Sequence, residues 1–463
     1  MVRDVNDDTF FLVTLGCKVN QYESQALREA WAARGLIAAE SAKDAATVCI
    51  STCAVTAGAV ADGRAAVRRV HRENPDAAII VTGCAAQVMP GEFQKLPGVT
   101  RVVPQQNKMT LLRYGEDASC EREGFCGASG GVQGSEGGGP QRDTETPPYP
   151  PFTITEYDRS RAIVKVQDGC SHRCTYCIVP LTRGTSRSRL PEATLDEAKR
   201  LLKAGFRELV LNGINLAQYG RDFAHEHDFW DLVAFLEAEL APEWAGCARI
   251  RLSSLEPGQL GPKALDVLGR SLLVAPHLHL SLQSGAKNVL RRMGRGHYDP
   301  DILHGFCAAL GEKLPRFGLG ADILTGFPGE TEEDAATTEA FCAALPFSYA
   351  HVFPYSRRPG TPAAAWRDQV DSGVKKERAA RLRAIFDAKS RRFLEDSLAL
   401  PVVRVACEVS GEGAARTFSG VDECYVECRF MKGHEPDASR SRSLVAAKPE
   451  AAGDGWLWVK SLE

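Results

Sequence analysis

The sequence predicts an α/β protein with three parts: a parallel open sheet, a partial barrel of six strands and a small antiparallel β-barrel. Three observations support this fold class. Short apolar runs alternate with helical patterns over residues 10–113, and the alternation resumes near residue 160, as in parallel α/β sheets. A polar, glycine-rich stretch separates these two regions, and only short strand-like runs follow residue 400.

Composition is typical of a globular protein. The chain has 463 residues, 44% hydrophobic and 25% charged, so about three domains of roughly 150 residues are expected. No stretch approaches the roughly 18 consecutive apolar residues of a membrane span, and the acidic N-terminus lacks the features of a secretory signal. We therefore expect a cytoplasmic protein without a membrane partner. Its 15 cysteines are too many for disulfides in that compartment and suggest metal ligation or thiol chemistry.

The parallel sheet is expected within a first domain over residues 1–113. Runs rich in β-branched and aromatic residues predict four strands, at residues 10–15, 46–52, 77–83 and 100–104. The first helical segment ends at Gly35, a typical C-capping residue. Cys17, Cys53 and Cys84, which we call the strand-end cysteines, each follow a predicted strand. Parallel strands end at one common edge, so these cysteines can converge there; the alternative is three small buried apolar side chains.

Residues 114–150 are expected to form a flexible linker. Nine glycines lie between residues 115 and 140, and the proline-rich TPPYPP follows them. Cys120 and Cys126 lie in this stretch, and we expect them to be incidental.

The partial barrel is expected over residues 151–395. Its six predicted strands alternate with helices and lie at residues 162–167, 208–213, 249–256, 277–284, 319–327 and 349–356. Thr194 and Glu197 predict a capping box at the start of one helix, and Gly205 predicts its end. The short strand-like runs then predict a small antiparallel barrel over residues 396–463.

Cys170, Cys174 and Cys177 form a tight cluster, CxxxCxxC, directly after the first strand of the predicted barrel. This position lies on the carboxyl-end face, where barrel enzymes build their active sites. A structural zinc site closes with four ligands, whereas a four-iron cluster on three thiolates leaves one iron open to a substrate or cofactor. His172 could complete a zinc site, but its position between two of the cysteines is awkward for a common tetrahedron. The iron–sulfur interpretation is favoured.

The CxxxCxxC with Tyr176 before its last cysteine resembles the signature of radical S-adenosylmethionine enzymes. Six motifs in this order, from about residue 10 to 395, resemble the methylthiotransferases: TLGCKVNQYES, STCAVT, VTGCAAQ, GCSHRCTYCIVPLTRGTSRSR, SLQSGAKNVLRRMGRGHY and DILTGFPGETEED. The resemblance implies two [4Fe–4S] clusters and S-adenosylmethionine as cofactors. It assigns the radical-generating cluster to the CxxxCxxC and an auxiliary cluster to the strand-end cysteines.

Within that family, GCKVNQYES, STCAVT and NGINLAQYGRD are most similar to the enzymes that methylthiolate threonylcarbamoyladenosine beside the tRNA anticodon. The group acting on isopentenyladenosine tends to have glutamine and methionine where Lys18 and Val19 stand, and the ribosomal-protein aspartate branch tends to have a proline after the first cysteine. These two groups remain alternatives, as does a non-catalytic iron–sulfur or RNA-binding protein. The resemblance also implies tRNA as substrate and an electron donor such as flavodoxin or ferredoxin.

The reaction implied by the resemblance uses two molecules of S-adenosylmethionine. One methylates a sulfur carried on the auxiliary cluster, and the other is cleaved reductively to a radical that removes hydrogen from adenine carbon 2. No protein general base is needed for that abstraction, so none is assigned.

Four further residues are candidates for the cofactor pocket. Tyr176 stacks near the adenine of the cofactor or merely packs the cluster loop. Ser281 and Gln283 alternate on one strand face and either line the pocket or cap the strand end. Gly326, in LTGFPGETEED, lets the backbone approach the methionine moiety or forms a tight turn.

RNA binding must come from local patches, because the net charge is −3. Residues 375–392 hold eight basic and two acidic side chains, and Arg183, Arg187 and Arg189 suggest a second patch. A solvated helix face is the alternative for such a charge run. Residues 396–463 resemble a divergent TRAM domain, the small barrel that grips tRNA in this family.

Overall fold

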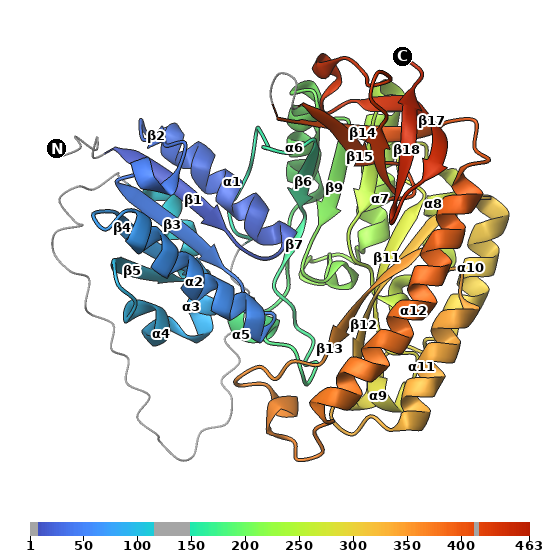
Figure 1. Cartoon of the computed structure of the whole chain (residues 1–463), viewed down its shortest axis with the longest axis horizontal. Helices are drawn as coiled ribbons and strands as arrows, with labels where there is room; N and C mark the ends of the chain where they lie inside the picture. The colour runs from blue at the N-terminus through green and yellow to red at the C-terminus, as the bar shows by residue number, and fades with distance from the viewer. Residues whose placement is uncertain (1–7, 115–148, 412–415) are drawn as a thin grey trace.

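The computed structural model describes residues 8–114, 149–411 and 416–463. Figure 1 shows the N-terminal sheet in blue beside the larger barrel in green to orange, with the C-terminal barrel in red packed at one end of it. Most of the expected linker, with Cys120 and Cys126, lies outside the described residues.

The N-terminal sheet has five parallel strands in the order β2-β1-β3-β4-β5. Four of them confirm the predicted strands, and the two-residue edge strand β2 was not predicted. Its residues are exposed and carry no alternating pattern. The strands are β1 (Thr9–Thr14), β2 (Ile37–Ala38), β3 (Thr47–Thr52), β4 (Ala78–Gly83) and β5 (Val99–Pro104). The helical segments are α1 (Lys18–Ala32), α2 (Ala57–Glu73), α3 (Cys84–Val88), α4 (Pro90–Gln94) and the 3₁₀ segment η2 (Gln105–Arg113).

The central region is an open barrel of six parallel strands, as predicted. Two three-stranded sheets, β10-β9-β6 and β11-β12-β13, are joined by isolated parallel bridges such as Leu255 to Leu280. The strands are β6 (Arg161–Lys165), β9 (Glu208–Asn212), β10 (Arg249–Leu252), β11 (His277–Gln283), β12 (Gly318–Thr325) and β13 (Tyr349–Pro354). A short antiparallel ladder, β7 (Gln167–Asp168) and β8 (Arg187–Ser188), flanks the first strand.

The helices of the barrel region cover its outer face (Figure 1), except the short first one, which packs against α3 of the N-terminal region. They are α5 (Val179–Arg183), α6 (Pro191–Lys203), α7 (Phe229–Trp244), α8 (Pro262–Arg270), α9 (Lys287–Arg292), α10 (Ile302–Lys313), α11 (Glu332–Ala344) and α12 (Ser372–Ser397). Gly205, at φ +99°, follows α6 and confirms the predicted end of that helix.

The capping box predicted at Thr194 and Glu197 is wrong. Helix α6 begins earlier, with Pro191 in its first turn, a position that suits proline because no backbone N–H is needed there. The Thr194 hydroxyl donates to the carbonyl of Leu190 inside the helix. The Glu197 carboxylate is fully buried and accepts hydrogen bonds from the Tyr22 hydroxyl, so it joins the barrel to the N-terminal region.

The C-terminal region is a closed five-stranded barrel in the order β14-β15-β16-β18-β17. The predicted barrel is confirmed, but β16 and β18 pair in parallel rather than antiparallel, because the chain crosses over and forms β17 before it returns. The strands are β14 (Val403–Ser410), β15 (Thr417–Val421), β16 (Glu427–Phe430), β17 (Leu444–Ala452) and β18 (Trp456–Ser461).

Arginines of β10 fasten the two barrels together. The fully buried Glu208 of β9 accepts from the guanidinium groups of Arg249 and Arg251. The same arginines donate onward to backbone carbonyls of the C-terminal barrel, including those of Val421 at 2.9 Å and Asp422 at 2.8 Å. Charge-assisted hydrogen bonds of this kind are among the stronger ones in proteins. They hold the C-terminal barrel in one position against the larger barrel.

Candidate active site

The three strand-end cysteines lie together at the carboxyl edge of the N-terminal sheet. Cys17 caps α1, Cys53 follows β3 and Cys84 begins α3, and β3 lies between β1 and β4 in the sheet. The Asn20 amide donates to the carbonyls of Leu15 at 2.9 Å and Thr52 at 3.0 Å, which holds the first two loops against each other.

Gly16 shows how closely the first two of these loops approach. Its φ of +93° suits glycine, and a Cβ at this position would lie 2.6 Å from the Cβ and 2.9 Å from the Sγ of Cys53. Only a residue without a side chain therefore leaves room for the Cys53 thiol beside Cys17.

The strand-end thiols interact electrostatically. Burial raises the pKa of the Cys53 thiol to about 11, and the nearby Cys17 and Cys84 reinforce the shift. Burial also raises the pKa of Cys84, while the Arg183 guanidinium acts to lower it. Without a metal these buried thiols are neutral, and they would bind a metal centre as thiolates only because the charge of the metal offsets the cost of deprotonation.

The CxxxCxxC cysteines occupy the loop that follows β7. Side-chain donors surround their sulfurs: Asn215 Nδ2 lies 3.8 Å and Gln218 Nε2 lies 3.7 Å from Cys170 Sγ, and Arg295 Nη1 lies 3.9 Å from Cys174 Sγ. Burial raises the pKa of the Cys177 thiol to about 12, and its two partner cysteines add to the shift. Donors aimed at sulfur orient and stabilise thiolate ligands of a metal cluster.

In neither cysteine trio do all three sulfurs lie close enough together to share a single metal ion. Among the described residues, two groups bring three ligand atoms within 4.8 Å of one another, and neither contains a cysteine. A tetrahedral zinc with Zn–S bonds of about 2.3 Å would need sulfurs about 3.8 Å apart. His172 is also engaged elsewhere, since its Nδ1 lies 3.4 Å from the Glu256 carboxylate. Both cysteine trios therefore fit a multi-iron cluster with one open iron.

The two cysteine sites are neighbours. Helix α3, which begins at Cys84, packs against α5, which begins two residues after Cys177. Ile178 lies in the same apolar cluster as Cys84. The two cysteine trios therefore lie on either side of the contact between α3 and α5.

A carboxylate and a guanidinium complete the surroundings of the CxxxCxxC. Burial opposes the charge of Glu256, but hydrogen bonds from His172 and His297 and the positive charge of Arg295 outweigh it and hold the pKa of Glu256 well below its usual value. The pair Arg295–Glu256 is 2.9 Å long and almost fully buried. The sequence predicted Glu256 as the last residue of the strand over 249–256, but it did not single out Arg295. The sequence feature that could have indicated Arg295 is its position in the RRMGRGHY motif.

The four candidate pocket residues differ in their surroundings. Tyr176 makes an edge contact with Phe327 at 6.2 Å. The Ser281 carbonyl accepts from Arg295 at 2.9 Å, and Gln283 has a φ of +69° where the β11 register shifts. Gly326 closes a turn, and a Cβ there would lie 2.3 Å from Lys375 Cγ. Ser281 thus adjoins the site through Arg295, while Gly326 faces α12; their cofactor roles stay predictions.

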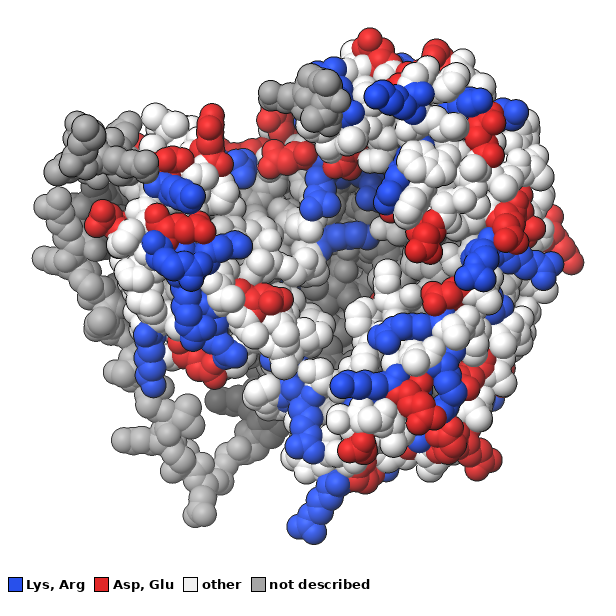
Figure 2. All heavy atoms as spheres, in the orientation of Figure 1, with Lys and Arg blue, Asp and Glu red and all other residues white. Residues whose placement is uncertain are grey.

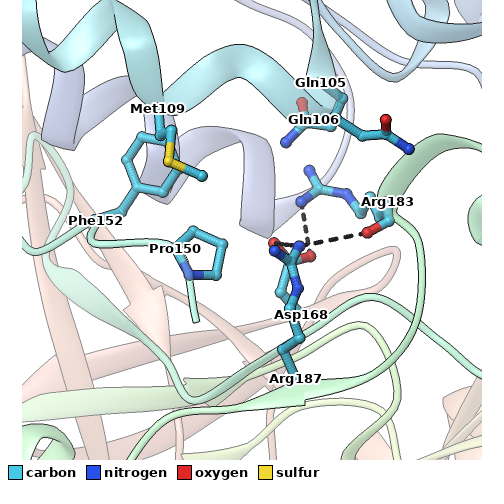
Figure 3. Close-up of a pocket in the computed structure, with 8 residues that line it drawn as sticks. All are labelled: Gln105, Gln106, Met109, Pro150, Phe152, Asp168, Arg183 and Arg187. Atoms are coloured by element: carbon cyan, nitrogen blue, oxygen red, sulfur yellow. Dashed lines mark hydrogen bonds and ion pairs between the residues drawn. The ribbon is translucent and has the colours of Figure 1, made fainter. Parts of the chain in front are cut away.

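A buried ionic network joins the N-terminal region to the barrel beneath the cysteine sites. Glu23 of α1, fully buried, lies 2.9 Å from Lys108 of η2 and 2.8 Å from both Lys165 of β6 and Arg183 of α5. Asp168 pairs with the same Lys165 and Arg183. Figure 3 shows Asp168 and Arg183 facing each other in a small cavity at this junction.

The arginine patch predicted after the CxxxCxxC is therefore wrong. Arg183 and Arg189 are 3% and 7% exposed, and Arg189 pairs with Glu197. Arg187 lies 3.7 Å from Asp168. Buried carboxylates neutralise these charges, so they are not available to phosphate.

The basic helix α12 divides into two faces. On one, Arg378 pairs with Glu330 at 2.8 Å and Arg381 with Glu339 at 2.8 Å, which binds the helix to α11 and the turn before it. On the other, Lys376 and Arg391 are exposed. Figure 2 shows basic and acidic side chains interspersed over one face of the molecule, with a hollow between the N-terminal region and the barrel.

Comparison with known proteins defines the class. Residues 9–104 match a family model described as uncharacterized protein family UPF0004, and residues 164–342 match the Radical SAM superfamily. The structure of the radical S-adenosylmethionine methyltransferase TsrM from Kitasatospora setae, with cobalamin and a [4Fe-4S] cluster bound, aligns with a TM-score of 0.56 at 16% identity, over 77% of this chain and 74% of that one. This likeness concerns the fold. The partial barrel and the superfamily match define a radical SAM enzyme, a class that uses S-adenosylmethionine and [4Fe–4S] clusters.

Relatives narrow this class to one family. Threonylcarbamoyladenosine tRNA methylthiotransferase MtaB of Bacillus subtilis (strain 168) is 39% identical over 82% of this chain and 80% of its own length. The protein of that name from Thermotoga maritima is 32% identical over 91% of both chains. A tRNA-2-methylthio-N(6)-dimethylallyladenosine synthase of Clostridium botulinum (strain Loch Maree / Type A3) is 30% identical over 82% of both. The chain belongs to the radical SAM methylthiotransferases. Within the described ranges, every helix is too short or too polar to cross a membrane.

Proposed function

We propose that this enzyme methylthiolates carbon 2 of threonylcarbamoyladenosine next to the tRNA anticodon. The observation that carries the proposal is the adjacency of the two cysteine sites across α3 and α5. Insertion of a methylthio group needs a radical source and a sulfur source within reach of one carbon atom, and two neighbouring open clusters meet that need. The relatives named for threonylcarbamoyladenosine, at 32–39% identity, support this substrate.

In the proposed enzyme, Cys170, Cys174 and Cys177 hold the radical-generating cluster, and the strand-end cysteines hold the auxiliary one. When bound, the clusters and two molecules of S-adenosylmethionine supply the reducing electron, the radical, the methyl group and the sulfur. The chain's own side chains bind and orient: Asn215, Gln218 and Arg295 donate toward the CxxxCxxC sulfurs. No side chain is assigned as a general base.

The substrate alternative is an adenosine with an apolar dimethylallyl group, as in the name of the Clostridium botulinum relative. Lys18 favours the threonylcarbamoyl group. It follows Cys17 directly, is exposed, and has no ion-pair partner in the described part of the chain. Its positive charge acts to lower the pKa of both His351 and Tyr425. A free cation beside the reaction site suits a substituent that carries a carboxylate, and a dimethylallyl group carries none.

The proposal extends to partners and organisation. Residues 396–463 and the outer face of α12 would contact tRNA, residues 151–395 would form the radical SAM domain, and residues 1–113 would bind the auxiliary cluster, with the linker over 114–150. A tRNA substrate implies a cytoplasmic enzyme, and the reductive step requires a one-electron donor such as flavodoxin or ferredoxin.

Mass spectrometry of tRNA nucleosides tests the proposal. A strain without the gene should lose methylthio-threonylcarbamoyladenosine and accumulate the unmethylthiolated nucleoside. Wild type and the control Cys247→Ala, which changes an exposed cysteine outside both sites, should restore it, whereas Cys174→Ala should not. Loss of methylthio-isopentenyladenosine instead would assign the other substrate. No change in either nucleoside, with no release of deoxyadenosine by the reduced protein, would favour a non-catalytic iron–sulfur protein.

A further inference from the structure

A second cluster of possible metal ligands lies inside the barrel, apart from the cysteines. His279 of β11, Asp322 of β12 and His351 of β13 bring their ligand atoms within 4.8 Å of one another. They stand on three consecutive parallel strands, and Asp322 is the register partner of His351. Side chains two residues apart on a strand share one face, so His279 lies on the same face of β11 as Ser281.

We propose that His279, Asp322 and His351 form a binding site for a divalent first-row transition metal ion. Two imidazoles and one carboxylate are a ligand set that zinc and ferrous iron both accept, and three protein ligands leave coordination positions open. This proposal does not depend on the substrate assigned above.

The distances are close to those of a bound site. His279 Nε2 and Asp322 Oδ1 are 3.1 Å apart, and ligands at about 2.1 Å from one tetrahedral ion lie roughly 3.4 Å apart. The third ligand, His351, is exposed and its ring centroid lies 5.5 Å from that of His279. One ligand atom of His351 already lies within 4.8 Å of those of His279 and Asp322.

The surroundings of His279 prepare one of its nitrogens for a metal. The Tyr349 hydroxyl lies 3.0 Å from His279 Nδ1 and 2.9 Å from His277 Nε2. When that hydroxyl donates to His277, it accepts the Nδ1–H of His279, and the Nε2 lone pair then points at the Asp322 site. Metal-binding histidines are commonly oriented by such a hydrogen bond on the other nitrogen.

The charge of Asp322 is also available. Among the ion pairs of the described residues, its partner is His279, and no lysine or arginine lies within the 4.0 Å of an ion pair, although the charge of Lys18 acts on the neighbouring His351. The other group with metal-ligand spacing, His172, Glu256 and His297, differs in this respect because Arg295 lies 2.9 Å from its carboxylate. The uncompensated carboxylate distinguishes the barrel site.

Zinc binding to the fully assembled protein tests the proposal. Protein with both clusters in place, so that the cluster cysteines are occupied, is equilibrated with Zn²⁺, passed over a weak chelating resin and analysed for zinc and iron. Wild type and the control His304→Ala, an exposed histidine of α10, should retain about one zinc per chain beside about eight irons. Asp322→Asn and His351→Ala should bind zinc at least tenfold more weakly. Tyr349→Phe should weaken binding about 10- to 100-fold, as loss of an orienting partner does.

Two results would overturn the site. One is equal zinc retention by wild type and Asp322→Asn, which would leave only a hydrogen-bonded polar cluster. The other is sulfur in the zinc coordination shell of the wild type, measured by X-ray absorption at the zinc edge. Iron content reports whether each variant is folded. If a variant is not folded, the X-ray absorption measurement on the wild type alone tests the site. Neither readout depends on methylthiolation.

Discussion

Glu23→Gln should strongly destabilise the junction between the N-terminal sheet and the barrel, although the two side chains have nearly the same shape. The substitution keeps the side-chain shape but removes one negative charge from among Lys108, Lys165 and Arg183, all of them buried. Breaking a buried ion pair by removing one partner costs about 3–5 kcal/mol, because a desolvated charge is left uncompensated. Two of these cations belong to the barrel, so the cost falls on the contact between the two regions.

The expected shift can be measured by thermal unfolding. For 463 residues at about 2.1 cal/mol/K per residue, the unfolding entropy is about 1 kcal/mol/K, so the midpoint should fall by about 3–5 °C if the chain unfolds as one unit. The matched control is Glu92→Gln, which removes the exposed pair with Arg64 and should cost at most about 1 kcal/mol. Adding Lys108→Met to the Glu23 variant should restore part of the loss, because it removes an uncompensated charge.

The pH dependence gives an independent check. The cations outweigh burial and hold the pKa of Glu23 well below its usual value. A depressed pKa in the folded state contributes stability that is complete above the unfolded pKa and is lost as the pH falls. The gap between wild type and Glu23→Gln should therefore be constant near neutral pH and narrow below about pH 4.5. Equal unfolding midpoints for the Glu23 and Glu92 variants at pH 7 would refute the reasoning.

Three more predictions concern the cysteine site, the C-terminal barrel and the substrate. Gly16→Ala should lower the iron content from about eight to about four per chain, because the added Cβ would collide with Cys53. The control Gly35→Ala, also at positive φ but with open space around it, should keep about eight irons. Equal iron contents in the two variants would contradict this prediction. Burial raises the pKa of Asp422 to about 6, so wild type should lose about 3 kcal/mol relative to Asp422→Asn as the pH rises from about 3 to 7, about half of it above pH 5. Urea midpoints measure this loss, and a difference that stays constant with pH would rule it out. Lys18→Met should raise KM for tRNA bearing threonylcarbamoyladenosine at least tenfold with kcat little changed, since a lost charge-assisted hydrogen bond costs about 1.5–3 kcal/mol. An unchanged KM would remove the support that Lys18 gives to this substrate assignment.

Local patterns were enough to predict the sheet and the barrel. The strands of both have uninterrupted or alternating apolar residues and are bounded by glycine or polar turns, a signal that depends on neighbours in sequence. The convergence of Cys17, Cys53 and Cys84 could also be foreseen, because parallel strands must end at one edge. Their spacing in the chain alone would not have shown it.

Partner choice across the chain could not be predicted in the same way. Glu197 lies where a capping box would place it in sequence, but its carboxylate pairs with Arg189 and accepts a hydrogen bond from Tyr22, 175 residues away. Arg183 resembles a surface charge until Glu23 and Asp168 are brought beside it. Such pairs depend on which surfaces the domains bury against each other, and single-sequence patterns carry no record of that.

The hydrogen bonds of Glu208, Arg249 and Arg251 between the two barrels have a consequence for engineering. Because the two arginines end on backbone carbonyls such as that of Asp422, a chain truncated before β14 would expose two guanidinium groups and the floor of the larger barrel to water. The C-terminal barrel is thus no detachable module. Chimeras that exchange it between relatives should remain soluble only if the incoming barrel presents carbonyls at the same positions.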